Sequence, residues 1–337
     1  MNRYYRNFTI IEKYISFIRH IFRYNQLYER VMKTLCFSLY KVFNMKNACL
    51  IAEAGCNHMG SVDIAKDIIK TASVFCKVDV VKFQKRNNRE LLPPKVYDSP
   101  HPNKKNAYGN TYGEHREFLE LDIETHRELK EYCEEFGLIY SCSVWDVTSA
   151  KEIAGLGPDM IKIPSACNTN MRLLNWLCEN YGGEIHLSLG MTTRKEEEEI
   201  VNFFCKTQRN KDLILYSCTS AYPVSQEDVC LLEIKRLRET YKNTVNDIGF
   251  SGHHKGIFFD IAALALGAKY IERHFTLDKT WKGTDHAASL EPDGMRRLKR
   301  GIMSTEIALS VKKDEILGIE LAQREKLKTY SSGVPAL

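Results

Sequence analysis

The fold is decided by two stretches, Gly249-Phe250-Ser251-Gly252-His253-His254 and Tyr270-Ile271-Glu272-Arg273-His274-Phe275. Each is a short apolar run that ends in polar and ionisable residues. Residues 257–267 between them have helical spacing and end in a glycine. In a parallel α/β protein this order of strand, helix and strand brings two strand ends side by side. His253 and His274 are therefore placed to share one metal ion.

The same alternation of a short apolar run and a helical pattern is found from Lys46 onward. The eight predicted strands are 48–53, 79–84, 137–143, 160–163, 184–188, 213–217, 248–251 and 270–272. Eight such units in about 260 residues are typical of a (β/α)8 TIM barrel. A doubly wound sheet is the alternative, but it seldom contains eight regular repeats.

The predicted barrel domain, 46–315, lies between a basic, aromatic-rich extension at 1–45 and a C-terminal helix and tail at 316–337. Residues 1–46 carry nine Lys or Arg against two acids, so they contribute +7 to a chain total of +5 and leave the remainder at −2. This near-neutral body gives no argument for nucleic-acid binding. The extension has the spacing of a basic amphipathic helix for a membrane surface, targeting or a partner. We favour a poorly ordered extension, or a leader before a second start at Met45.

The cysteines and the hydropathy pattern indicate a cytoplasmic protein. The eleven cysteines are scattered, odd in number and contain no CxxC pair, which is typical of a reducing compartment. No apolar run approaches the roughly 20 residues that a membrane-spanning helix needs.

Ionisable and hydroxyl side chains gather at the ends of the predicted strands, where TIM barrels have their active sites. They are Glu53, Asn57, His58, Lys82, Gln84, Ser143, Lys162, Ser165, Ser188, Thr219, Ser220, Ser251, His253, Glu272 and His274. Lysines with hydroxyls predict an anion pocket that fits a phosphate. Two imidazoles suit Mn, Fe, Co or Zn and leave positions open for substrate. The carboxylates, including Asp285, can hold sugar hydroxyls or move protons.

Other histidines and charges have simpler interpretations. His58 lies in a turn and is equally well explained as a cap of the next helix. His115 and His126 are predicted to face solvent without a function, and His254 to support its neighbour. The run 195–199 is predicted to be the solvated start of a helix, where acids suit the dipole.

At these residues the sequence resembles the sialic acid synthase (N-acetylneuraminate synthase) family, from about Ala48 to Pro292. The matching motifs are Ile51-Ala52-Glu53-Ala54-Gly55-Cys56-Asn57-His58-Met59-Gly60, Val81-Lys82-Phe83-Gln84, Lys162-Ile163-Pro164-Ser165, Leu189-Gly190-Met191, Cys218-Thr219-Ser220-Ala221-Tyr222-Pro223, Ser251-Gly252-His253, Ile271-Glu272-Arg273-His274-Phe275-Thr276-Leu277-Asp278 and Gly283-Thr284-Asp285-His286. Any one motif is weak evidence, but their order and spacing together are specific.

The resemblance implies a homodimeric TIM-barrel enzyme that condenses phosphoenolpyruvate with N-acetylmannosamine or a related hexose and releases phosphate. It implies a divalent metal at His253 and His274, commonly Mn²⁺, with Mg²⁺ or Co²⁺ as alternatives. The implied phosphoenolpyruvate ligands are Lys82, Lys162, Ser165, Ser188 and Ser251. The implied contacts of the sugar or the water are Glu53, Gln84, Glu272 and Asp285. Tyr222 matches a pocket residue, and Ser143 and Ser220 join the substrate-binding set because they lie at strand ends.

Three departures from the family pattern limit the resemblance. Members often have an acidic residue just after the Lys-Ile-x-Ser segment, where this chain has Ala166-Cys167-Asn168. Ser220 replaces a common asparagine and makes one phosphate contact uncertain. Many members carry a C-terminal antifreeze-like domain, for which the residues after Pro292 leave no room, so we expect the N-acyl group of the sugar to be recognised differently or by another chain.

Two alternative functions stay open at this point. One is a synthase of a related 3-deoxy sugar acid that uses a phosphorylated or non-acetylated sugar, for which Lys85, Arg86 and Lys282 are the basic residues near the strand ends. The other is a barrel that has lost catalysis and acts as a binding module. A decayed site rarely keeps all its ionisable groups, which argues against the second alternative.

Overall fold

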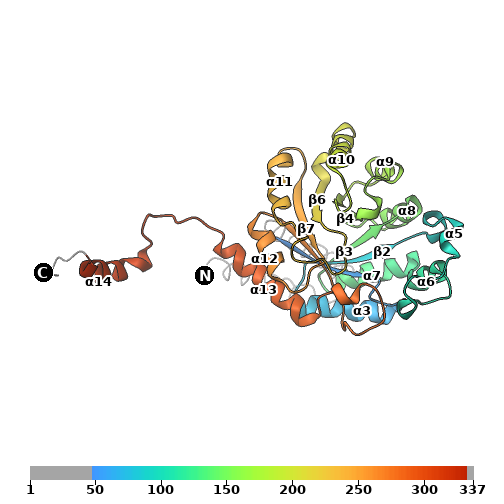
Figure 1. The fold of residues 1–337 in the computed structure, drawn as a ribbon, viewed down its shortest axis with the longest axis horizontal. Helices are drawn as coiled ribbons and strands as arrows, with labels where there is room; N and C mark the ends of the chain where they lie inside the picture. The colour runs from blue at the N-terminus through green and yellow to red at the C-terminus, as the bar shows by residue number, and fades with distance from the viewer. Residues whose placement is uncertain (1–47, 332–337) are drawn as a thin grey trace, which may run out of the picture.

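A closed barrel of eight parallel strands forms the centre of the molecule in a computed structural model, which describes residues 48–331 (Figure 1). The strands are β1 Cys49–Gly55, β2 Val80–Lys85, β3 Ile139–Val144, β4 Met160–Ile163, β5 Glu184–Ser188, β6 Leu213–Cys218, β7 Asp247–Gly252 and β8 Tyr270–His274. Each strand pairs with the next, and β1 closes the barrel against β8 through Glu53 beside His274. The predicted TIM barrel is confirmed, and the doubly wound sheet is excluded. The predicted extension at 1–45 lies outside the described residues.

Helices follow the strands and form the outer layer of the barrel (Figure 1). They are α3 Val62–Thr71 with a π-helical turn Ala72–Cys76, α4 Asn88–Leu91, α5 Pro94–Tyr97, α6 Tyr112–Leu119, α7 Ile123–Glu135, α8 Val147–Gly155, α9 Met171–Asn180, α10 Arg194–Lys206, α11 Leu232–Tyr241, α12 Phe258–Ala265, α13 Pro292–Ala308 and α14 Leu321–Ser331. Short 3-10 turns are Lys104–Asn106, Ser165–Cys167, Asn210–Asp212, His286–Ala288 and Gly318–Glu320.

Local side-chain chemistry explains where the helices begin. Thr193 caps α10 in a capping box with Glu196, which satisfies two backbone donors of the first turn. Glu197 in the same turn is buried and paired with Arg236 at 2.6 Å, so the predicted helix start is correct but its run of acids is only partly solvated. Helix α11 begins at Leu232, after a segment that Ser225 turns by donating to Asp228 at 2.6 Å.

The inside of the barrel has its own small core, separate from the larger core between strands and helices. It consists of Ile51, Val80, Met160, Ile214, Tyr216 and Tyr270. The ring of Tyr216 fits because β7 has Gly249 beside it, where a Cβ would lie 2.6 Å from the ring. The barrel is therefore filled by side chains below its carboxyl end.

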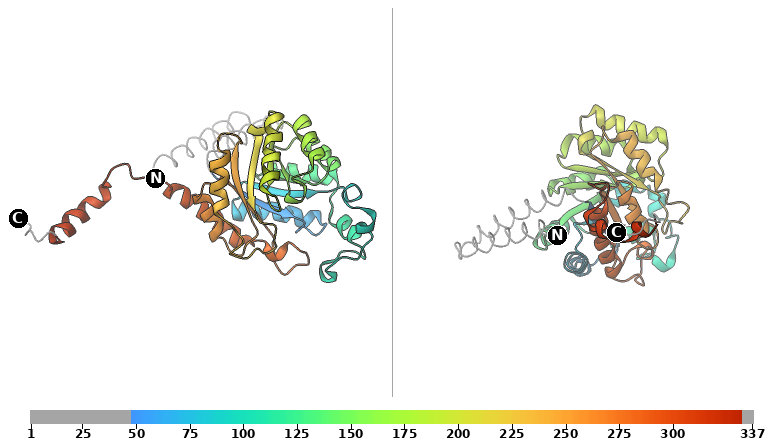
Figure 2. Two further views of the ribbon diagram at one scale, coloured as in Figure 1. Left: turned by 45° about the horizontal axis from the view of Figure 1, so that its top comes forward. Right: turned by 90° about the vertical axis from the view of Figure 1, so that its left-hand side faces the viewer.

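Helix α14 stands away from the barrel, joined to α13 by an extended segment (Figure 1; Figure 2, left). The described α14 side chains, 321–328, are exposed to solvent. Among the described residues, no helix is both long and apolar enough to cross a membrane. The ten cysteines in the described residues are free thiols.

Candidate active site

Two lysines and two glutamates form a buried network at the carboxyl end of the barrel. Lys82 on β2, Lys162 on β4, Glu53 on β1 and Glu272 on β8 are each at most 6% exposed. Lys162 Nζ donates to both carboxylate oxygens of Glu272, at 3.1 and 3.0 Å. Lys82 Nζ pairs with Glu53 and lies 3.8 Å from Glu272 Oε2. Two positive and two negative groups thus share one water-poor space.

Burial separates the proton affinities of the two glutamates. Burial raises the pKa of Glu53, although the charge of Lys82 opposes it. Burial also acts to raise the pKa of Glu272, but Lys162 and Lys82 outweigh it and hold that pKa well below its usual range. Glu272 therefore stays ionised, whereas Glu53 is the carboxylate better suited to gain and lose a proton.

The two lysines respond differently to the same surroundings. Burial lowers the pKa of Lys162, and the neighbouring Glu272 only partly restores it. For Lys82 burial also acts downward, but Glu272 and Glu53 together raise its pKa above the usual value. Protonation of Lys162 consequently depends more on its immediate contacts than protonation of Lys82 does.

Hydroxyl and amide groups fix the orientation of this network. Lys82 Nζ donates to Ser143 Oγ at 2.7 Å, and Ser251 Oγ donates to Glu272 Oε1 at 3.0 Å. Gln84 Nε2 donates to Glu53 Oε1 at 2.7 Å. The charged groups are thus held in place before any ligand arrives, which is what electrostatic catalysis requires.

A small cradle of donors lies around Gly190, after β5. Its backbone N–H donates to Ser165 Oγ at 3.1 Å. A Cβ on Gly190 would lie 2.3 Å from Ser220 Oγ and 2.6 Å from Ser165 Oγ, so both hydroxyls converge where a side chain is missing. Ser220 Oγ is buried and has no hydrogen-bond partner among the described residues. Asn168 fixes the adjoining strand end by donating to the carbonyl of Ser188 at 2.9 Å.

The two predicted metal ligands lie side by side, with ring centroids 5.5 Å apart. His253 Nδ1 lies 2.9 Å from the carbonyl oxygen of Thr219, which only accepts, so Nδ1 carries the hydrogen and Nε2 keeps its lone pair. His274 Nδ1 is buried without a hydrogen-bond partner in the described residues and lies 3.9 Å from Asp285 Oδ2. Burial lowers the pKa of His274 and favours the neutral form.

These two imidazoles fit a divalent metal, because their rings lie side by side and each has a ring nitrogen without a hydrogen bond to the backbone. Within residues 48–331 no group of three or more His, Cys, Asp or Glu side chains is arranged to hold a metal. A metal there would depend on two protein ligands, with substrate or water in its remaining positions.

The remaining predicted residues lie around the same opening. The Tyr222 ring is 4.2 Å from that of His253 and 5.9 Å from that of His274, so it forms a wall beside them. Gly55, with φ +54°, leaves room where Gln84, Glu53 and Asp285 meet; a Cβ there would lie 3.0, 3.2 and 3.4 Å from their polar atoms. The predicted site residues thus lie in the strands or in the loops that follow them, with Asp285 reaching the site from the loop after β8.

Two histidines that were predicted to face solvent are buried. The exposed fraction is 1% for His115 and 0% for His126, so the prediction was wrong for both. His115 Nδ1 accepts from the N–H of Tyr108 at 3.2 Å and joins the aromatic cover formed after β2. His126 Nδ1 lies 2.7 Å from Tyr140 OH, between α7 and β3. Helical spacing alone did not show that these helix faces are covered by tertiary packing.

His58 and His254 have structural contacts. His58 Nδ1 accepts from the N–H of Gly60 at 3.1 Å and closes the turn, while the cap of α3 is Ser61. His254 Nε2 lies 3.0 Å from Arg273 Nη1, and its carbonyl accepts from Arg273 Nη2 at 2.6 Å. Arg273 therefore holds His254, which directly follows His253. This contact is consistent with the supporting role predicted for His254.

The sequence named Arg86 only as a basic residue for a phosphorylated sugar, and not as a partner of Gln84. Arg86 donates to Gln84 Oε1 and lies 4.0 Å over the ring of Trp145, while its Nη1 is 3.4 Å from Glu120. It orients the Gln84 amide from behind. Its place two residues after Gln84, just beyond a strand end, was the available signal.

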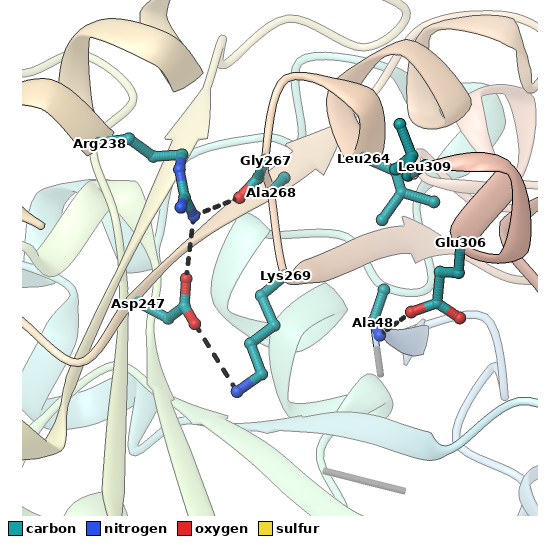
Figure 3. A pocket seen from close by; sticks show the side chains of 9 residues that line it. All are labelled: Ala48, Arg238, Asp247, Leu264, Gly267, Ala268, Lys269, Glu306 and Leu309. Atoms are coloured by element: carbon teal, nitrogen blue, oxygen red, sulfur yellow. Dashed lines mark hydrogen bonds and ion pairs between the residues drawn. The ribbon is translucent and has the colours of Figure 1, made fainter. Parts of the chain in front are cut away.

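A hollow of about 350 Å³ lies at the amino end of the barrel, away from the site (Figure 3). Its charges are engaged with one another: Asp247 lies 3.5 Å from Arg238 and 3.6 Å from Lys269. TIM-barrel sites lie at the carboxyl ends of strands, so we assign the site by chemistry and not by volume.

Comparisons with known proteins show which family the chain is similar to. Residues 68–314 match the NeuB family, a range that includes β2 to β8 and every predicted site residue except Glu53. N-acetylneuraminate-9-phosphate synthase of Mus musculus is 37% identical over 286 residues, covering 84% of this chain and 77% of that protein. N,N'-diacetyllegionaminic acid synthase of Campylobacter jejuni is 35% identical over 266 residues, covering 79% of this chain and 78% of that protein. The crystal structure of N-acetylneuraminic acid (sialic acid) synthetase from Leptospira borgpetersenii in complex with citrate is 28% identical with a TM-score of 0.70, covering 84% of this chain and 93% of that chain.

Proposed function

The chain belongs to the NeuB family, the sialic acid synthases, and from that premise we propose that it condenses phosphoenolpyruvate with N-acetylmannosamine or a related hexose. The products are a nonulosonic acid and phosphate. One observation carries the proposal: Lys82 and Lys162 are buried at the same barrel end as a cradle of hydroxyls and two histidines that fit a metal. That set suits an anionic phosphate ester and a carbonyl compound in one space.

The lysines and hydroxyls account for binding of phosphoenolpyruvate. Its phosphate and carboxylate take positions near Lys82 and Lys162, whose present partners are the carboxylates of Glu53 and Glu272. Ser165, Ser220 and the N–H of Gly190 supply directional hydrogen bonds to phosphate oxygens. The ligand therefore replaces ion pairs that the protein makes with itself.

The chemical step forms a bond between C3 of phosphoenolpyruvate and the aldehyde carbon of the open-chain sugar. Water then adds at C2, and phosphate leaves with cleavage of its C–O bond. A divalent metal at His253 and His274 would supply Lewis-acid polarisation of the aldehyde oxygen. We assign Glu53 to take the proton of the water, because burial raises its pKa above the usual value. Gln84, Glu272 and Asp285 hold the sugar and the water.

The acceptor class is the finer part of the proposal, and we favour an unphosphorylated sugar. The basic residues offered by the sequence for a second phosphate have partners: Lys85 lies 3.5 Å from Glu152, and Arg86 pairs with Glu120. Lys282 lies 4.5 Å over the ring of Tyr108. A phosphorylated acceptor is the second candidate, since the mouse relative is named for a 9-phosphate product.

Further parts of the proposal concern the working enzyme. We propose Mn²⁺ as the metal, with Mg²⁺ or Co²⁺ as alternatives, a homodimer as the assembly, and 46–315 as the catalytic unit. These follow the sequence resemblance. A cytoplasmic location is supported by the free thiols of the ten described cysteines.

The test is phosphate release from phosphoenolpyruvate with purified protein and Mn²⁺. The acceptors compared are N-acetylmannosamine, its 6-phosphate and mannose, and His274→Ala is the control, with its fold checked by circular dichroism. We expect release that requires an acceptor, is fastest with N-acetylmannosamine and is lost in the variant. No release with any acceptor, by folded and metal-loaded protein, would overturn the proposal in favour of a binding module.

A further inference from the structure

We propose that Tyr216 is a positioning residue for Lys162, and that His186 and Glu184 hold Tyr216 in place through a hydrogen-bonded chain inside the barrel. The chain leads from the amino-terminal end of β5 to the anion-binding end of the site. This inference deepens the proposed function and rests on Lys162 as a ligand of phosphoenolpyruvate.

The first step is the contact between Lys162 and Tyr216. Lys162 Nζ lies 3.6 Å from the centroid of the Tyr216 ring, and both side chains are buried. An ammonium over the face of an aromatic ring is attracted by the ring quadrupole, most strongly where water is absent. Tyr216 thus supports the charge of Lys162 together with the carboxylate of Glu272.

The second step is the pair formed by Tyr216 and His186. His186 Nε2 lies 3.2 Å from Glu184 Oε2, and a carboxylate only accepts, so Nε2 carries the hydrogen. Burial lowers the pKa of His186, so its other nitrogen, Nδ1, is an acceptor. Tyr216 OH lies 2.7 Å from Nδ1 and therefore donates to it. Donation draws the hydroxyl proton away from the ring and makes the ring face more negative toward Lys162.

The third step is the anchor of the chain at the other end. Glu184 Oε2 also accepts from Tyr270 OH at 3.2 Å, and Oε1 accepts from Asn246 Nδ2 at 3.2 Å. The ring of Tyr270 meets that of His186 edge-on, with centroids 4.9 Å apart. The carboxylate that polarises the chain is therefore fixed by three side chains.

A tyrosine has an advantage here over a second carboxylate. A carboxylate below Lys162 would cancel its charge and weaken its attraction for phosphate. A ring face supports the ammonium without a formal negative charge, and it leaves the N–H donors of Lys162 for Glu272 or for the substrate. The four other members of the inner core besides Tyr270 are Ile51, Val80, Met160 and Ile214, so the polar chain is confined to one side of an apolar interior.

The test uses Tyr216→Leu, which removes the ring face, and Tyr216→Phe, which keeps the ring and removes the bond to His186. Affinity for phosphoenolpyruvate is measured by isothermal titration calorimetry, and kcat and KM by phosphate release. We expect Tyr216→Leu to weaken phosphoenolpyruvate about tenfold, with kcat changed less, and Tyr216→Phe to weaken it about two- to threefold. The alkaline limb of kcat/KM moves about one pH unit lower in Tyr216→Leu.

Several titratable groups face Lys162 and can contribute to this limb: Glu272 on β8, Lys82 on β2, Cys218 and Tyr216 on β6, and His186 on β5. NMR of ¹³C-labelled lysines, with Lys162→Met to identify the resonance, follows Lys162 itself without turnover. In Tyr216→Leu we expect Lys162 to lose its proton about one pH unit lower than in the wild type.

Ile51→Ala is the control, because it removes packing from the same inner core and Ile51 has no part in the hydrogen-bonded chain. We expect a loss of stability but unchanged phosphoenolpyruvate affinity and an unchanged alkaline limb. Equal effects of Tyr216→Leu and Ile51→Ala on affinity and on the alkaline limb would overturn the inference and leave a packing role. A wild type that neither binds nor turns over phosphoenolpyruvate would overturn the proposed function instead, and the NMR titration would still decide whether Tyr216 supports the charge of Lys162.

Discussion

The two ends of the barrel both carry charged side chains, but only the carboxyl end buries them completely. At the amino end, Asp247 bridges Arg238 and Lys269 in a hollow open to solvent (Figure 3). At the carboxyl end, Lys162 and Glu272 are inside the protein. An exposed pair contributes about 0–1 kcal/mol, whereas burial costs several kcal/mol for each ion. The cost of burial supports the proposal that the carboxyl-end network binds a ligand, whereas the pairs at the amino end are ordinary surface pairs.

The largest effect is expected from Lys162→Met. The variant leaves Glu272 buried with a weaker counter-charge and removes one phosphoenolpyruvate ligand. We predict a loss of about 3 kcal/mol in the free energy of unfolding and a fall of about 10³-fold in kcat/KM for phosphoenolpyruvate. Urea denaturation and phosphate release measure the two. Lys269→Met, at the amino end, is the control.

Glu53→Gln is expected to have the next largest effect. It keeps the shape and the hydrogen bond from Gln84 but removes the carboxylate that takes the proton. We predict a fall in kcat of about 10²- to 10³-fold with little change in phosphoenolpyruvate affinity. Glu306→Gln, which alters a carboxylate bonded to the backbone of Ala48 at the amino end, serves as comparison. A kcat that stays within threefold of wild type in Glu53→Gln would remove Glu53 from the mechanism.

Buried histidines without a counter-charge form a third case beside the two barrel ends. Their burial makes the free energy of unfolding depend on pH. Burial lowers the pKa of His126 to about 3 and that of His58 to about 4. In the unfolded chain both histidines bind a proton near pH 6.5. Their burial therefore has no pH-dependent effect on the free energy of unfolding above that pH and lowers it as pH falls toward 4. We predict a loss of roughly 3 kcal/mol from His126 alone at pH 4. Thermal unfolding of His126→Gln, with its flatter slope between pH 6.5 and 4, measures it.

The smallest effect is expected at the amino end. Asp247→Asn removes the charge between Arg238 and Lys269, all of them partly exposed. We predict a change of less than about 1 kcal/mol in unfolding free energy, reduced further by salt, and no change in kcat/KM. A loss of unfolding free energy or of kcat/KM as large as that in Lys162→Met would contradict the distinction between the buried carboxyl-end network and the exposed pairs at the amino end.

The sequence predicted the barrel and the site's location because both depend on local patterns. Eight apolar runs with polar ends place Lys82, Lys162 and His253 on the same side in any parallel barrel. Contacts that depend on tertiary packing were not accessible in this way. Whether His126 faces solvent is decided by the position of α7 against β3, and the link between Tyr216 and His186 by the register of β5 and β6. Within an apolar run, nothing local distinguishes Tyr216 from a packing residue.

The most direct test of the account is acceptor-dependent phosphate release compared in three proteins: wild type, Lys162→Met and Lys269→Met. We predict that the wild type and Lys269→Met release phosphate from phosphoenolpyruvate at rates within twofold of each other, roughly the scatter of a surface substitution. Lys162→Met, shown to be folded, releases almost none. Equal activity of the two lysine variants, or equal loss in both, would contradict the assignment of the buried carboxyl-end network as the catalytic centre.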